Sequence, residues 1–236
     1  MADKQIKSKE RVAERGEVFT AEREVNTMLD LVKQETERID SRFLEPACGT
    51  GNFLVEILRR KLDVIWQNNT NLYGRNMDHN QTDCQLVQAV GSIYGIDIMQ
   101  DNLEECRERL LEIICEWYPH AHLGGKLEGE LLQTVRYVLS RNILWGDALT
   151  LCEPMPAGAT PQQKRDARPI TFSEWGFIGD MVKRRDYTLN MLLQCAPMEG
   201  PNLFSDLGED AFIPQPCAEY KPIHYLKLFT QDATEQ

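Results

Sequence analysis

The sequence has no run of apolar residues near the roughly 18 that a membrane-spanning helix needs, and its opening residues, Met1 to Gln5, do not begin a signal peptide. None of the seven cysteines stands in a Cys-x-x-Cys pair, so neither a zinc ribbon nor a thioredoxin-type redox pair is visible. Of the four histidines only His120 and His122 are neighbours, and residues two apart on a helix point in different directions. We therefore expect buried free thiols in a reducing compartment, no metal site, no membrane segment and a cytoplasmic location.

The sequence also lacks an excess of basic residues. It has 26 Lys and Arg against 37 Asp and Glu, which gives a formal net charge of −11. Binding to DNA phosphates requires clustered cations, so this balance argues against a freestanding nucleic-acid-binding protein. It remains compatible with a nucleic-acid enzyme whose basic surface is local or is supplied by a partner.

The 236 residues, of which 42% are hydrophobic, are enough for one large domain or for one domain with an appendage. Strand patterns at 42–44, 92–98 and 142–145 alternate with helical patterns at 52–61, 101–117 and 129–139. This alternation predicts an α/β fold with a mainly parallel sheet and helices on both faces.

Less regular sequence surrounds this alternation. Residues 1–15 are charged and have no apolar face, which predicts a frayed arm or an exposed helix start. The polar stretch 67–84 predicts a long loop. Prolines gather after residue 150, so we expect a core at 1–150 and an irregular C-terminal extension at 151–236, with one helix over about 178–194.

The most informative stretch runs from Glu45 to Gly51, with an acid at a strand end, then a Gly-x-Gly turn, then a helix. Asp97 and Asp147 stand at the ends of the next two predicted strands. In an open parallel sheet, ligands bind beyond the carboxyl ends of the strands, where glycine lets the backbone approach them. Acids there accept hydrogen bonds from a ribose diol and an exocyclic amine. No phosphate-binding lysine follows the glycines, so the set fits an adenosine ligand without a pyrophosphate. The alternative is that Asp97 and Asp147 only cap the strand ends.

At these residues the sequence resembles the S-adenosylmethionine-dependent DNA methyltransferases that modify the exocyclic amine of adenine. The matching stretches are 15–20 (RGEVFT) for motif X of restriction–modification methylases, 43–53 (FLEPACGTGNF) for motif I, 94–98 (YGIDI) for motif II and 146–149 (GDAL) for motif III. Ala21 stands where motif X usually has a proline. The resemblance implies a Rossmann-like class I methyltransferase sheet.

The resemblance also implies which residues bind S-adenosylmethionine. Glu45 and the backbone of residues 47–51 would hold its methionine part, and Asp97 its ribose hydroxyls. Ile98 would pack on the adenine ring, and Asp147 would accept a hydrogen bond from the adenine amine. The full expected set is Thr20, Glu45, Pro46, Ala47, Gly49, Gly51, Asn52, Asp97, Ile98, Asp147 and Ala148. For Cys48 we expect a small, half-buried thiol without reactivity.

The catalytic motif of that family is missing. In it, a polar side chain and a proline carbonyl of an acceptor–Pro-Pro–aromatic sequence accept the hydrogens of the adenine amine, and the aromatic ring stacks on the flipped base. This sequence has no Pro-Pro pair, and neither 153–156 (EPMP) nor 213–216 (IPQP) has the pattern. No catalytic residue can therefore be assigned. We expect an isolated chain that does not methylate DNA, and DNA contact through a partner subunit in a homo- or hetero-oligomer.

Two features stand out after residue 150. The aromatic stretch 172–177 (FSEWGF) and the basic triplet 183–185 (KRR) would dock a partner or DNA phosphate if they were exposed. The alternative places the aromatic rings in the core and the triplet on a solvated helix face.

Three functions remain open from the sequence. The first is the cofactor-binding part of an adenine methyltransferase of restriction–modification or phage-defence type, with base binding and catalysis supplied by another chain or lost. The second is a non-catalytic S-adenosylmethionine-binding regulatory module. The third is a methyltransferase that acts on a small molecule or a protein and needs no Pro-Pro motif. The acidic charge favours the last two, and motif I favours the first.

Overall fold

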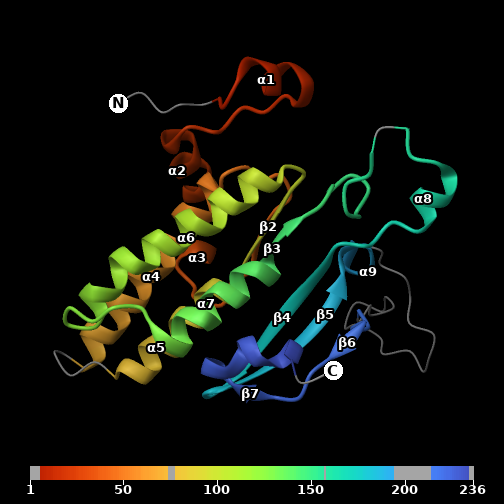
Figure 1. Cartoon of the computed structure of the whole chain (residues 1–236). Helices are drawn as coiled ribbons and strands as arrows, with labels where there is room; N and C mark the ends of the chain where they lie inside the picture. The colour runs from red at the N-terminus through yellow and green to blue at the C-terminus, as the bar shows by residue number, and fades with distance from the viewer. Residues whose placement is uncertain (1–5, 74–77, 157, 194–213, 234–236) are drawn as a thin grey trace, which may run out of the picture.

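The computed structural model describes residues 6–73, 78–156, 158–193 and 214–233 (Figure 1). The chain begins with the helices α1 (Lys9–Arg15), α2 (Glu22–Asp30) and α3 (Lys33–Thr36). It continues with β1 (Phe43–Glu45), α4 (Asn52–Tyr73), α5 (His79–Gly91), β2 (Ile93–Asp97), α6 (Gln100–Ala121), α7 (Gly129–Asn142) and β3 (Ile143–Trp145). The last part holds α8 (Pro161–Arg165), β4 (Thr171–Ile178), β5 (Met181–Thr188), α9 (Leu189–Leu193), β6 (Ala218–Glu219), β7 (Ile223–His224) and the 3₁₀ helix η1 (Tyr225–Ala233).

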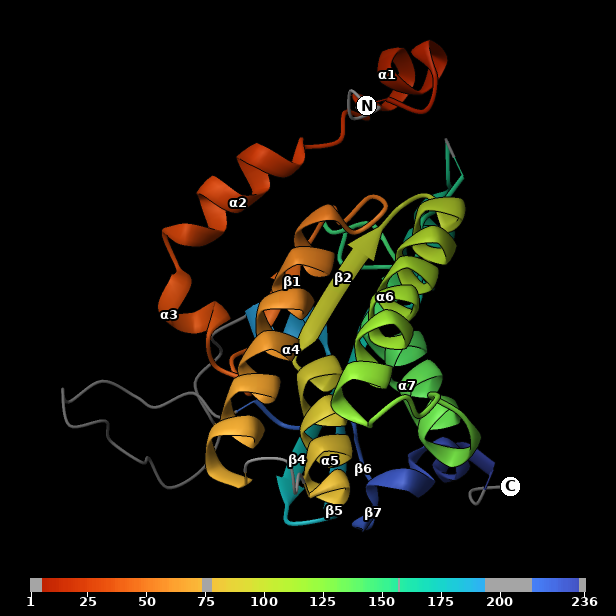
Figure 2. The same cartoon turned by 90° about the vertical axis from the view of Figure 1, so that its left-hand side faces the viewer.

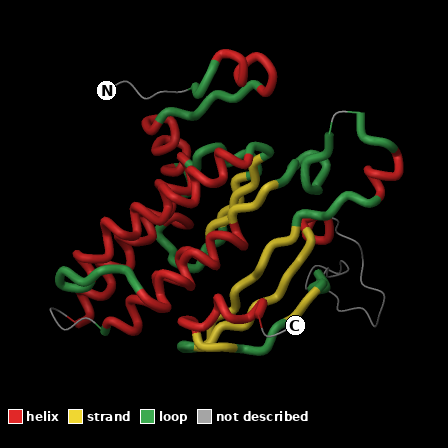
Figure 3. Tube along the Cα trace, viewed as in Figure 1, coloured by secondary structure: helices red, strands yellow, loops and turns green. Residues whose placement is uncertain are grey.

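The strands β1, β2 and β3 form a parallel sheet in that order. Figure 3 shows the strands in yellow, beside the red helices. The register pairs Glu45 with Gly95 and Asp97 with Trp145, so the carboxyl ends of the three strands meet at one edge. All residues of the central strand β2 are buried. The predicted mixed α/β class is confirmed, with these strands in parallel.

The helices α4 and α6 cover one face of this sheet (Figure 2). A side chain at Gly95 of β2 would lie 2.9 Å from Leu54 of α4, which shows how closely the helix packs. The expected helices on both faces are not confirmed. Because β-α-β crossovers are right-handed, strands added in one direction carry their helices on one face, and the other face receives helices only after the strand order reverses. Although α4 and α6 have 22 residues each, no helix among the described residues is both long and apolar enough to cross a membrane.

The second face of the parallel sheet is covered by the antiparallel hairpin of β4 and β5, which β6 and β7 extend. The hydroxyl of Tyr94 in β2 donates to the carbonyl of Ser173 in β4 at 3.0 Å. The Tyr94 ring meets the ring of Phe172 edge to face, with centroids 5.4 Å apart. Together with Ile96, Ile170 and Leu189, these rings form a second hydrophobic cluster.

The predicted helix over 178–194 is wrong, because residues 181–188 form strand β5 and, of the described residues in this range, only Leu189–Leu193 is helical. The inward positions of β5 include Val182, Arg184 and Asp186, and two of these are charged. Polar residues at buried positions hide the apolar–polar alternation by which a strand is recognised in a sequence. The division into 1–150 and 151–236 stays a prediction.

The basic triplet is not a single exposed face. Arg184 is 1% exposed, and it pairs with Asp186 at 2.6 Å and with Asp232 of η1 at 2.7 Å. Lys183 and Arg185 on either side are partly exposed and pair with Glu219. In the aromatic stretch, Trp175 lies in the core, as one of the two alternatives had it, and its Nε1 donates to Asn142 at 3.0 Å.

The predicted loop over 67–84 is also wrong for most of its length, since α4 continues to Tyr73 and α5 begins at His79. Asn69 is 1% exposed, and its amide donates to Thr82 at 2.9 Å and to Gln85 at 3.1 Å. The polar residues here satisfy one another between two helices, so polarity did not indicate exposure. Residues 74–77 lie outside the described residues.

Candidate functional site

The turn between β1 and α4 depends on two glycines with left-handed backbone. Gly49 has φ +52° and Gly51 has φ +86°, a region that other residues adopt only with strain. A Cβ atom at Gly51 would lie 2.5 Å from the Sγ of Cys106 in α6, and one at Gly49 would lie 3.0 Å from the ring of Phe19. The Gly-x-Gly pattern therefore serves both the conformation of this turn and its close packing.

Asp97 at the end of β2 holds this turn. One oxygen of its carboxylate accepts from the main-chain N–H of Gly49 at 2.9 Å, and the other accepts from Met99 N–H at 2.7 Å and from the Asn102 amide at 3.3 Å. The Asp97 side chain is only 9% exposed. The structure thus brings the predicted glycine turn and the second predicted acid together.

Glu45, Pro46 and Ala47 form the entry to the turn. Glu45 is half-buried at the end of β1, next to Gly95 of β2. Burial raises the pKa of the Glu45 carboxyl, and a hydrogen bond from the main chain of Ala47 opposes that rise. Glu45 therefore sits at the predicted edge, one strand away from Asp97.

The third strand brings Asp147 to the same edge. The N–H of Gly146 donates to the carbonyl of Asp97 at 3.1 Å, which joins the ends of β2 and β3. The Asp147 carboxylate accepts from the N–H of Leu149 at 2.9 Å, so it caps its own turn. Its neighbour Ala148 packs against the second hydrophobic cluster.

Ile98 follows directly after Asp97 and is 37% exposed. Its carbonyl accepts from the indole of Trp145 at 2.9 Å. An apolar side chain is thus fixed in position, with part of its surface in solvent, between the ends of β2 and β3. Glu45 and Asp97 end the adjacent strands β1 and β2, and Asp147 follows the end of β3, in the arrangement that the sequence predicts.

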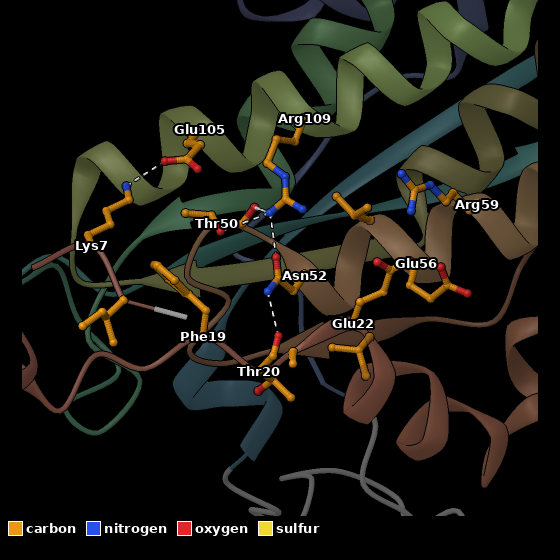
Figure 4. Close-up of a pocket in the computed structure, with 14 residues that line it drawn as sticks. Lys7, Phe19, Thr20, Glu22, Thr50, Asn52, Glu56, Arg59, Glu105 and Arg109 are labelled. Carbon is orange, nitrogen blue, oxygen red and sulfur yellow. Dashed lines mark hydrogen bonds and ion pairs between the residues drawn. The ribbon is translucent and has the colours of Figure 1, made fainter. Parts of the chain in front are cut away.

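Thr20 and Asn52 meet beside the glycine turn (Figure 4). The amide of Asn52, the first residue of α4, donates to the carbonyl of Thr20 at 2.8 Å. The Asn52 oxygen accepts from Nη1 of Arg109 in α6 at 2.8 Å. Nη1 of Arg109 also donates to the carbonyl of Thr50 at 2.7 Å and to its hydroxyl at 3.1 Å. The segment before β1, the turn and α6 are therefore joined.

A pocket of about 500 Å³ opens beside these residues. Its lining comes from the segment 6–25, the turn with the start of α4, and α6, and includes Thr20, Thr50, Asn52, Arg59 and Arg109. Such a volume suits a small organic ligand. Arg109 belongs to none of the motifs that the sequence shows. The one signal for it was that it follows the buried Cys106 by three residues, which puts it on the edge of the inner face of α6.

The N-terminal arm, residues 6–19, crosses to α6. Lys7 pairs with Asp101 at 3.2 Å and with Glu105 at 2.7 Å, and Arg11 pairs with Asp101 at 2.6 Å. The hydrogen bond from Arg11, together with Lys7, lowers the pKa of Asp101 to about 2. Residues 9–15 form a helix, as the second alternative for 1–15 had it, and residues 1–5 lie outside the described residues. The ion pairs of Lys7 and Arg11 hold the segment that leads to Thr20 against α6.

Cys48 within the turn is buried. Its contact with the Cys106 thiol and its burial both raise its pKa, so it stays a neutral thiol at ordinary pH. Cys48 is thus more deeply buried than the half-buried position that was expected, and its lack of reactivity stays a prediction.

A search of curated proteins and a search of solved structures each found no match. Residues 6–105, which include the arm, the glycine turn and Asp97, match the model of the N-6 DNA methylase family. In this part the chain is similar to DNA methyltransferases.

Proposed function

We propose that the chain is the S-adenosylmethionine-binding part of a DNA methyltransferase that modifies the exocyclic amine of adenine, in a restriction–modification or phage-defence system. The match of residues 6–105 to the N-6 DNA methylase family supports the reaction class. The observation that carries the proposal is the contact of Gly49 N–H with the Asp97 carboxylate at 2.9 Å, because it brings the glycine turn and the strand-end acids to one edge of a parallel sheet.

The residues at this edge fit the cofactor. The Asp97 carboxylate accepts from three donors of the protein, and an ionised carboxylate has about four acceptor sites. This leaves capacity for a ribose hydroxyl. Asp147 has one carboxylate oxygen engaged with Leu149, and the half-exposed Ile98 offers an apolar surface to an adenine ring. When bound, S-adenosylmethionine supplies a methyl group on a positively charged sulfur, and the chain's own groups bind and orient it.

The groups that hold the target base come, in this proposal, from a different polypeptide. The sequence has no Pro-Pro pair, so a second copy of the chain cannot supply the missing motif. Among the described residues β1 pairs only with β2, and Leu44 of β1 is 45% exposed. In doubly wound sheets the ligand crevice lies where strands extend to both sides of the first strand. The free edge of β1 therefore fits a strand from the partner.

The net charge of −11 supports DNA contact through that partner, because the chain by itself repels the duplex. The test is transfer of labelled methyl groups to duplex DNA by the purified chain, alone and mixed with proteins encoded next to its gene. We expect no transfer by the chain alone and N6-methyladenine in one mixture. Cofactor binding without methylation in any mixture would favour a regulatory module or another methyl acceptor.

A further inference from the structure

Arg109 brings an available positive charge to the glycine turn. Its hydrogen bonds within the described residues all come from Nη1 and end on neutral acceptors, namely the carbonyl and hydroxyl of Thr50 and the amide oxygen of Asn52. A guanidinium has five N–H donors. Within the described part of the chain, Nε and Nη2 of Arg109 have no hydrogen-bond partner. These donors and the charge are free to bind a ligand.

Three acids line the same pocket, Glu22, Glu56 and Glu105, and none of them forms an ion pair with Arg109 within the described residues. Glu105, one turn earlier on α6, is paired with Lys7 at 2.7 Å. Glu56 of α4 is paired with Arg60 at 3.0 Å. Arg59 also lines the pocket and has no ion pair within the described residues. The pocket therefore holds two guanidinium groups, from α4 and α6, that form no ion pair within the described residues (Figure 4).

The pocket adjoins the proposed cofactor edge. Thr50, which Arg109 holds, stands between Gly49 and Gly51, and Gly49 is bound to Asp97. S-adenosylmethionine ends in an α-amino acid group with a carboxylate. The cofactor-binding set that the sequence predicts includes three acids, Glu45, Asp97 and Asp147, but no Lys or Arg. A carboxylate among these acids requires a cation, and guanidinium binds carboxylate through two parallel hydrogen bonds.

We propose that Arg109 binds the carboxylate of the cofactor's amino-acid end, which enters the pocket between the segment 6–25, α4 and α6. The inference rests on the proposed function, because it takes S-adenosylmethionine as the ligand. Arg109 then has two roles on one side chain: Nη1 holds the turn, and the remaining donors bind the ligand.

The first experiment needs no mutation. Calorimetry on the whole chain compares S-adenosylmethionine with decarboxylated S-adenosylmethionine, which lacks only the carboxylate. We expect the decarboxylated ligand to bind about 10- to 100-fold more weakly, as the loss of a charge-assisted pair predicts. Equal affinities would overturn the inference while cofactor binding stands. If neither ligand binds, the proposed function fails, and the inference fails with it.

The second experiment repeats both titrations with Arg109→Gln. We expect this variant to bind S-adenosylmethionine about 10- to 100-fold more weakly and to bind the decarboxylated ligand with an affinity changed by less than about 2-fold. The reason is that the substitution and the decarboxylation each remove one partner of the same guanidinium–carboxylate pair. Equal weakening of both ligands would mean that Arg109 only holds the turn, and would overturn the proposal. Arg136→Gln, at an exposed position on α7, is the matched control and should change neither affinity. If Arg109→Gln does not fold, the comparison of the two ligands on the unmodified chain still tests the proposal.

Discussion

The main-chain N–H of Gly49 donates to the carboxylate of Asp97 across 2.9 Å. This bond joins the turn after the first strand to the end of the second, residues that are 48 positions apart in the sequence. The carboxylate that we propose for the ribose is therefore also the group that holds the turn beneath the cofactor. A change at Asp97 should consequently affect stability and binding together.

Asp97→Ala removes the acceptor of the Gly49 and Met99 N–H groups at a buried position. We expect the free energy of unfolding to fall by about 1–3 kcal/mol, as for a buried donor left unpaired, and the affinity for S-adenosylmethionine to fall with it. Urea denaturation and calorimetry measure the two effects. Asp63→Ala, at an exposed position on α4, should leave both unchanged. Unchanged stability of Asp97→Ala would contradict the bond to Gly49.

Gly51→Ala should destabilise the chain for two separable reasons. The left-handed backbone at φ +86° costs about 1–2 kcal/mol for a residue with a Cβ atom, and that atom would lie 2.5 Å from Cys106. Gly158→Ala, at φ +80° with nothing within 4 Å, carries only the first cost and is the matched control. Thermal or urea unfolding should show the larger loss for Gly51→Ala. Adding Cys106→Ala to Gly51→Ala should recover part of it, and strictly additive losses would argue against the contact.

Lys61 should give a pH-dependent contribution to stability. It is fully buried in α4, and its ammonium donates to the carbonyls of Arg38, Ile39 and Ser41. Burial lowers the pKa of Lys61 from 10.5 to about 8, so between these values the unfolded chain keeps a proton that the folded chain has lost. The contribution of Lys61 to the free energy of unfolding therefore rises between about pH 8 and pH 10.5. Below about pH 8 the cost of burying its charge is fully present.

The comparison of wild type with Lys61→Met isolates this effect from other titrating groups. At neutral pH the variant should lose about 1–3 kcal/mol, because three carbonyls lose their donor. The difference in unfolding free energy between wild type and variant should widen as the pH rises from 8 towards 10. A difference that stays constant over this range would contradict the lowered pKa.

Arg184→Met should be the most damaging change in the basic triplet. It leaves Asp186 buried without its cationic partner, which typically costs about 3–5 kcal/mol. Arg185→Met, on the exposed side of the same strand, removes pairs with Glu174 and Glu219 that are worth less than about 1 kcal/mol. Denaturation of the two variants measures the difference. Similar losses would show that Arg184 is not the buried residue of the three.

Local patterns in the sequence were sufficient for the elements around the candidate site. Glu45, the two glycines and the start of α4 lie within a few residues of one another, and Asp97 and Asp147 each stand at the end of a strand pattern of their own, so backbone preference and side-chain periodicity predict them. The mixed α/β class follows from the alternation of strand and helical patterns along the sequence. The helix of 178–194 and the loop of 67–84 were wrong because burial of Arg184 and Asn69 depends on partners elsewhere in the chain.

The sequence by itself determined the turn from Glu45 to Gly51 and the strands that end in Asp97 and Trp145, because these depend on neighbouring residues. Only the tertiary structure decided which face of the sheet the helices cover, since that depends on the direction in which β2 and β3 are added to β1. It also decided that Arg109 meets Thr50, 59 positions away. Contacts between distant segments depend on how whole helices and strands pack, and no local spacing in the sequence encodes that packing.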